Sequence, residues 1–223
     1  SEMPANIDSW SSTYKGLIIH SADEAGSFDG PDYSFGWGLM NTAKAAEIIR
    51  FNHSGCQYSA PMDTELGLLK NIYELSINRG EVKEFEVYKT EGEPLKVTVS
   101  WNDPAGDVGP RALDNSTPAL INDIDLRVIS SANEKTFFPW KLNPSNPSAA
   151  ATTGDNNVDN TEQVVVNDIP AGRYIVKVNM ESTSRALIQN ISLIITGNDR
   201  LIHDLTVSPQ SATSLDRNIT DGE

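Results

Sequence analysis

The chain has 223 residues, 38% of them hydrophobic, and a formal net charge of −14 at pH 7. This length can bury one good core and has room for one large or two unequal domains. The negative charge argues against nucleic acid as a partner, because an acidic surface repels phosphates. No apolar run approaches the roughly 20 residues that a helix needs to cross a bilayer, so we expect no membrane span. Cys56 is the one cysteine, which excludes an internal disulfide.

Residues 1–60 predict two helices that flank a loop. We expect Ser11 to cap the first helix and Asn41 to cap the second. The predicted faces comprise Tyr14, Leu17, Ile18, Ser21 and Ala22 in the first helix, and Ala43, Ala46, Ile48 and Ile49 in the second. The loop 26–38 contains four glycines, so it should be a compact, turn-rich connection in which Trp37 is an aromatic plug.

After Pro61 the apolar spacing becomes two, which is typical of strands with one buried face. In the clearest run, Leu95, Val97, Val99 and Trp101 alternate with Lys96, Thr98 and Ser100. The predicted strands are 75–77, 82–88, 95–101, 124–129, 162–166, 174–178 and 187–196. Short strands without helices between them predict a mainly β fold, an antiparallel β-sandwich or jelly roll. The tail, 199–223, is expected to be a linker or the start of a further β module.

Two segments resemble parts of one protease family. Residues 15–23 and 32–46, with Phe35-Gly36-Trp37-Gly38 leading into an Ala-rich helix, are similar to the end of a subtilisin-like serine protease catalytic domain. From about residue 66 to Gly197 the chain resembles the C-terminal jelly-roll domain of one group of secreted bacterial members of that family. The matching segments are 100–106, 122–126, 139–140 and 154–163.

The resemblance implies an organisation and a setting. It implies the end of an α/β catalytic domain over 1–60 and a jelly-roll domain over 61–198. It also implies a secreted or cell-surface bacterial protein, whose partners are its own catalytic domain and the protein or peptide substrate of the parent.

The catalytic part of that family is missing from this sequence. The family's nucleophile motif, Gly-Thr-Ser-Met-Ala-x-Pro, does not occur and would lie before residue 1. A catalytic triad acts as a unit, so we expect this chain to be inactive alone, with the chemical groups of any acyl transfer outside it. His20 lies beside Ser21 and close to Asp23, but neighbouring helical residues point in different directions, so we expect His20 to cap or pack at a helix end. His53 and His203 are expected in connecting segments.

A calcium site is predicted from carboxylate spacing. On a strand, Asp123 and Asp125 share a face about 7 Å apart, while Ile124 faces the core. The run from 155 to 159 offers further oxygens, which calcium takes in flexible geometry. The candidate ligands are Asp123, Asp125, Asp155, Asn157 and Asp159. An EF-hand is rejected, because Asn160 and Val166 occupy its glycine and glutamate positions. Spacing alone leaves a solvated acidic face equally open, whereas the resemblance favours calcium, which such jelly-roll domains commonly hold.

Aromatic residues leave a second type of site open. Trp101, Phe137, Phe138 and Trp140 are the kind of residues that bind sugars on jelly rolls, but packing is favoured. Trp101 is in phase with the core of its strand, and Trp140 is expected to hold the loop 143–153.

Three classes of function follow from these patterns. The first is the noncatalytic C-terminal portion of a secreted subtilisin-like endopeptidase, which stabilises the catalytic domain and binds calcium. The alternatives are an independent carbohydrate- or protein-binding jelly-roll module and a relative of the protease that has lost its triad. The helical front segment favours the first class over a free-standing binding module.

Overall fold

The structure is a computed structural model that describes residues 9–54, 71–109, 117–167 and 170–204. It is mainly β, with antiparallel sheets and two helices, α1 (Ser11–Ser21) and α2 (Thr42–Ser54). The strands are β1 (Ile72–Asn78), β2 (Val82–Lys89), β3 (Leu95–Trp101), β4 (Ile124–Ser130), β5 (Thr136–Phe137), β6 (Trp140–Lys141), β7 (Thr152–Thr153), β8 (Thr161–Val166), β9 (Gly172–Met180), β10 (Ile188–Thr196) and β11 (Asn198–Asp204). All seven predicted strands are present, with ends that shift by up to three residues.

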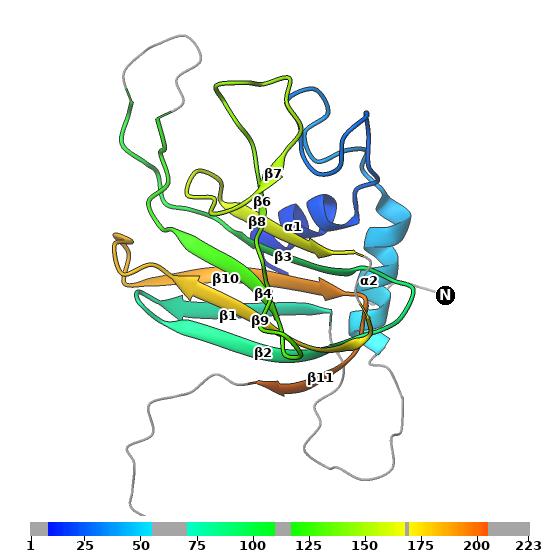
Figure 1. The fold of residues 1–223 in the computed structure, drawn as a ribbon. Helices are drawn as coiled ribbons and strands as arrows, with labels where there is room; N and C mark the ends of the chain where they lie inside the picture. The colour runs from blue at the N-terminus through cyan, green and yellow to red at the C-terminus, as the bar shows by residue number, and fades with distance from the viewer. Residues whose placement is uncertain (1–8, 55–70, 110–116, 168–169, 205–223) are drawn as a thin grey trace, which may run out of the picture.

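The described strands form two larger sheets and one short hairpin (Figure 1). The four-stranded sheet has the order β1-β10-β3-β8, and the five-stranded sheet has the order β11-β2-β9-β4-β5. β6 pairs with β7, so the hairpin closes the loop 143–153. These pairings are antiparallel.

One hydrophobic core lies between the two larger sheets. Its fully buried residues come from alternate positions, as the period of two predicts. In β4, for example, Ile124, Leu126 and Val128 are 0% exposed. Trp101 is also 0% exposed and belongs to this core, so the packing prediction for it is confirmed.

α1 lies on the other face of the four-stranded sheet. Ser12 Oγ and Thr13 Oγ1 are hydrogen-bonded to Ser192 Oγ at 2.7 and 2.8 Å. On β3, Thr98 and Ser100 are fully buried beneath the helix. The expectation that β3 has only one buried face is wrong, because a helix instead of solvent covers its polar side.

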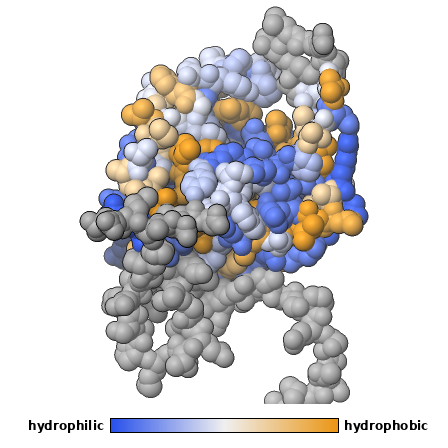
Figure 2. Space-filling model, turned by 180° about the vertical axis from the view of Figure 1, so that it is seen from behind, coloured by the Kyte–Doolittle hydropathy of each residue, from blue (hydrophilic) through white to orange (hydrophobic). Residues whose placement is uncertain are grey.

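The contact face of α1 differs from the predicted apolar face. It consists of Ser12, Thr13, Gly16, Leu17, His20 and Ser21. Tyr14 and Ile18 are instead 44% and 47% exposed. Short side chains let the helix approach the sheet closely, since a Cβ at Gly16 would lie 3.0 Å from Ile194 Cδ1. Figure 2 shows one face of the molecule, on which apolar groups are separated by polar ones.

The predicted caps have different outcomes. Ser11 is the first residue of α1 and not its cap, because Trp10 occupies the N-cap position. The backbone N–H of Trp10 donates to Glu74 Oε1 at 2.7 Å, so a carboxylate from β1 complements this helix end. The cap of α2 is confirmed, since Asn41 Oδ1 accepts from the backbone N–H of Lys44 at 2.9 Å.

The loop between the helices is compact, as predicted. The backbones of Asp23 and Leu39 exchange two hydrogen bonds of 2.8 Å. Gly38 adopts φ +100°, and a Cβ there would lie 2.2 Å from the carbonyl oxygen of Asp23. Only glycine fits this closely approached, left-handed position. Trp37, the predicted plug, is half-buried.

The tail is predicted to be a linker or the start of a further β module, and its described part is a strand. Residues 198–204 form β11, which pairs with β2 and extends the five-stranded sheet, so this part of the tail is a strand and not a linker. His203 therefore lies in a strand and His53 in α2, instead of in connecting segments. Cys56 and residues 205–223 lie outside the described residues.

Candidate cation-binding site

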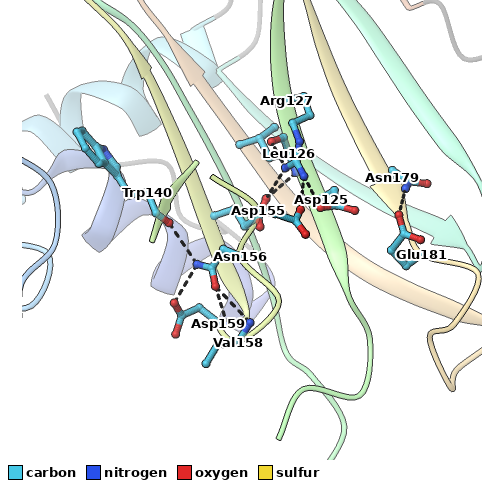
Figure 3. A network of polar contacts seen from close by, with 11 residues as sticks. Asp125, Leu126, Arg127, Trp140, Asp155, Asn156, Val158, Asp159, Asn179 and Glu181 are labelled. Atoms are coloured by element: carbon cyan, nitrogen blue, oxygen red, sulfur yellow. Dashed lines mark hydrogen bonds and ion pairs between the residues drawn. The ribbon is translucent and has the colours of Figure 1, made fainter. Parts of the chain in front are cut away.

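A group of charged side chains lies where β4 passes close to β8 (Figure 3). Because Leu126 faces the core, the alternating residues Asp125 and Arg127 point to the other side of β4. Asp123 immediately precedes the strand, and Asp155 comes from the loop after β7. Three of the five predicted metal ligands are thereby brought together.

Arg127 is the cationic centre of this group. Its Nη2 donates to Asp125 Oδ1 at 2.8 Å and also to Asp155. Its Nη1 donates to the carbonyl oxygen of Leu126 at 2.9 Å. The guanidinium carbon lies 4.9 Å from the ring centroid of Phe138, so an aromatic ring also contacts the cation.

Glu162, on β8, belongs to this candidate site and, like Arg127, was not predicted from the sequence. Its side chain is 0% exposed, and its Oε2 accepts from the backbone N–H of Leu126 at 2.6 Å. Oε2 also lies 3.8 Å from Arg127 Nη1, whereas Oε1 is buried without a hydrogen-bond partner. A buried carboxylate with one unpaired oxygen is unfavourable unless a proton or a cation compensates it.

The strand pattern could have identified Glu162. It is in phase with Val164 and Val166, both 0% exposed, so the period of two places a carboxylate on the core side of β8. A carboxylate at such a position requires a specific partner.

Glu162 and Asp125 hold their protons more tightly than usual, whereas Asp155 does not. Burial raises the pKa of Glu162 well above its ordinary value, and the hydrogen bond from Leu126 only partly opposes this. Burial, followed by close contact with the Asp155 carboxyl, raises the pKa of Asp125 to about 7. The pKa of Asp155 is lowered, first by the hydrogen bond with Asp125, so Asp125 holds the proton of this pair.

Asp123 is perturbed in the same direction. Burial is the largest cause of its raised pKa, and the charges of Asp155 and Glu181 add to it. Its Oδ1 is a second buried oxygen without a hydrogen-bond partner. The cluster therefore contains more carboxylate than the guanidinium of Arg127 can neutralise.

The other two predicted ligands lie apart from this cluster. Asn156, which is 4% exposed, organises their loop: its Oδ1 accepts from the backbone N–H groups of Val158 and Asp159, and its Nδ2 donates to Asp159 Oδ2 at 2.9 Å. Asp159 thereby faces away from Arg127, as Figure 3 shows. Asn157 is exposed on the same loop. In the described parts of the chain, no group of three or more His, Cys, Asp or Glu side chains is arranged to hold a metal ion.

His20 forms no relay with its sequence neighbours. Its Nδ1 is hydrogen-bonded to Thr98 Oγ1 at 2.8 Å and its Nε2 to Thr196 Oγ1 at 2.9 Å. Asp23 instead accepts from Asn41 Nδ2 at 2.8 Å. The ring is 2% exposed, and burial, helped by the charge of Lys96, lowers its pKa to about 3. The prediction that His20 packs at a helix end is confirmed.

Comparison with known proteins gives no further identification. No protein-family model and no curated protein matches this chain. Among the described residues, no helix is long and apolar enough to cross a membrane. The function is therefore inferred from the motifs and from the geometry of the structure.

Proposed function

We propose that this chain is the noncatalytic C-terminal portion of a secreted, bacterial subtilisin-like serine endopeptidase, and that its β region braces the helical front segment and binds calcium. In the sequence, a segment that resembles the end of a subtilisin-like catalytic domain is followed by one that resembles a jelly-roll domain. This order supports the assignment to the C-terminal portion of such a protease. The shared core of the two larger sheets supports a sandwich of the jelly-roll type. On this proposal the partners are the parent's catalytic domain and its protein or peptide substrate.

The packing of α1 on the four-stranded sheet supports the proposal that the β region braces the helical front segment. The helix is held at both ends, by Ser12 and Thr13 on Ser192 and by His20 between β3 and β10. Leu17, at 3% exposure, fills the space between these two polar contacts. A helix attached at two separate points cannot rotate or slide on the sheet without breaking buried hydrogen bonds, which are costly to leave unmade.

The unpaired oxygen of Glu162 is the observation that carries the calcium proposal. Calcium takes six to eight oxygen ligands in flexible geometry. Asp123, Asp125, Asp155 and Glu162 would hold the ion after their side chains turn towards it, because the described side chains do not already form a metal-binding group. Backbone carbonyls or water would complete its shell. The guanidinium of Arg127 neutralises the same carboxylates, so we expect it to move aside when the ion binds. The two positive charges of calcium would stabilise the ionised carboxylates of Asp125 and Glu162, which would therefore no longer need their protons.

Thermal melting with calcium and with chelator tests this site. At a calcium concentration of about one hundred times the dissociation constant, binding should raise the free energy of unfolding of the wild type by about 2.7 kcal/mol. Asp125→Ala should abolish this gain. Asp107→Asn is the matched control, because Asp107 is an exposed aspartate that pairs with Arg185 outside the cluster, and it should respond as the wild type does. Equal melting midpoints with calcium and with chelator in the wild type would remove calcium from the proposal.

A separate experiment tests the noncatalytic role. The chain should neither hydrolyse casein nor be labelled by a fluorophosphonate, since the family's nucleophile motif is absent and His20 is enclosed. An intact subtilisin-like protease is the positive control. Covalent labelling of a serine in this chain would contradict the noncatalytic assignment without affecting the calcium result.

A further inference from the structure

A small pocket lies between the front segment and the β6–β7 hairpin. Its volume is about 200 Å3. The hairpin and the loop that follows α1 approach each other in the fold (Figure 1), and α1 and β8 complete the walls. The residues that carry the argument are Trp37, Trp140, Lys15, Lys141, Asp32 and Asp159.

Two indole rings line this pocket. Two contacts hold the backbone of Trp140: it pairs with Thr153, and its carbonyl oxygen accepts from Asn156 Nδ2 at 3.3 Å. Its ring packs on Gly30, where a Cβ would lie 2.7 Å from Cδ2 of the indole. Trp37 is half-buried and comes from the opposite wall, in the front segment. The aromatic part of the pocket is therefore built from segments about one hundred residues apart in sequence.

The pocket is lined by groups of both charges, and Asp103 also acts on Lys15. Lys15 Nζ donates to the carbonyl oxygens of Trp101 and Asn160 at 2.8 and 3.0 Å, which leaves one of its three N–H groups for a ligand. Burial lowers the pKa of Lys15 to about 8, so it still carries its charge at neutral pH. With Lys141, it balances the carboxylates of Asp32 and Asp159. Asp159 uses Oδ2 for Asn156 and keeps Oδ1 as an acceptor.

We propose that this pocket binds a single uncharged sugar ring. An indole face suits the C–H surface of a pyranose, and the surrounding donors and acceptors suit its hydroxyl groups. The charges of the two lysines are offset by Asp32 and Asp159 in the lining and by Asp103 near Lys15, so the pocket offers no net attraction for an anion. A volume of about 200 Å3 is below the range of drug-sized ligands, which favours one ring over a longer chain. The proposal goes beyond the calcium site and does not depend on it.

Ligand-observed NMR on the full chain tests the proposal. The probes are the methyl glycosides of glucose, galactose, mannose and N-acetylglucosamine, each at about 50 mM because single-ring affinities are weak, in the millimolar range. Glucuronate and glucosamine serve as charged comparators. We expect a saturation-transfer signal for at least one methyl glycoside, and weaker signals for both charged sugars.

Variants locate the binding. Trp37→Ala should weaken it about tenfold, whereas Trp10→Ala, in a different cavity, should leave it unchanged. Lys141→Gln, at an exposed position, gives a second variant that should weaken binding if Trp37→Ala does not fold. The proposal is overturned by no transfer to any of the four glycosides, by equal binding to the pocket variants and the wild type, or by stronger binding of a charged sugar.

Discussion

Replacing His20 by glutamine should change how the stability of the protein depends on pH. The imidazole is enclosed between α1 and the sheet, and burial lowers its pKa to about 3 from its ordinary value of 6.5. The unfolded chain therefore binds a proton between these two pH values that the folded chain does not bind. A base with a lowered pKa contributes stability that is present above 6.5 and is lost as the pH falls towards 3.

The expected size of this effect follows from the pH range between the two pKa values of His20, about 3 and 6.5. Each pH unit below 6.5 removes about 1.36 kcal/mol from the free energy of unfolding, so about 2 kcal/mol is lost at about pH 5. Glutamine retains a donor and an acceptor for Thr98 and Thr196 but does not titrate. The stability of the wild type relative to His20→Gln should therefore fall by about 2 kcal/mol between about pH 7.5 and about pH 5.

Urea denaturation in the presence of chelator, followed by tryptophan fluorescence, measures this difference. Comparison with the variant is necessary because Asp125 and Glu162 act in the opposite direction. Their pKa values are raised, so they favour the folded state at low pH and lose that contribution as the pH rises. These carboxyl groups are common to both proteins and cancel. A stability difference that stays constant across the pH range would show that the folded state does not lower the pKa of His20.

Three further substitutions have expected outcomes. Asn41→Ala removes the cap of α2 and should cost about 1 kcal/mol in urea denaturation, with Asn41→Asp close to the wild type; no loss would contradict the capping role. Gly38→Ala places a Cβ against the Asp23 carbonyl oxygen at positive φ and should cost about 2 to 3 kcal/mol, which an unchanged melting midpoint would exclude. Glu162→Gln retains an acceptor for Leu126 without the charge, so in chelator it should stabilise the protein by about 1 to 3 kcal/mol, increasingly as the pH rises. A destabilised Glu162→Gln protein at high pH would show that the carboxylate is already compensated.

The strands could be predicted because residues that face the core alternate along a strand with residues that face away from it. That alternation is local information, and it places Ile124, Leu126 and Val128 correctly. It could not show what lies on the other face of a sheet. Thr98 and Ser100 have the pattern of solvent-facing residues, yet they are buried because α1 packs over them. The contact face of α1 was mistaken for the same reason, since its partner surface is polar.

The candidate site was partly predictable. Asp123 and Asp125 lie on one segment, so their proximity follows from strand geometry, whereas the approach of Asp155 depends on the path of a loop. The separation of Asp159 depends on the buried amide of Asn156, which sequence spacing does not identify as the organising residue. Arg127 and its position among the carboxylates required tertiary structure.

The backbone of Leu126 has a consequence for self-association. Beyond the short β5, the edge of β4 would present an open N–H and C=O, yet Glu162 accepts from the first and Arg127 donates to the second. Two charged side chains thus occupy the positions that an incoming strand of another molecule would use. At Leu126 this edge is therefore closed to the intermolecular strand pairing that begins fibril growth.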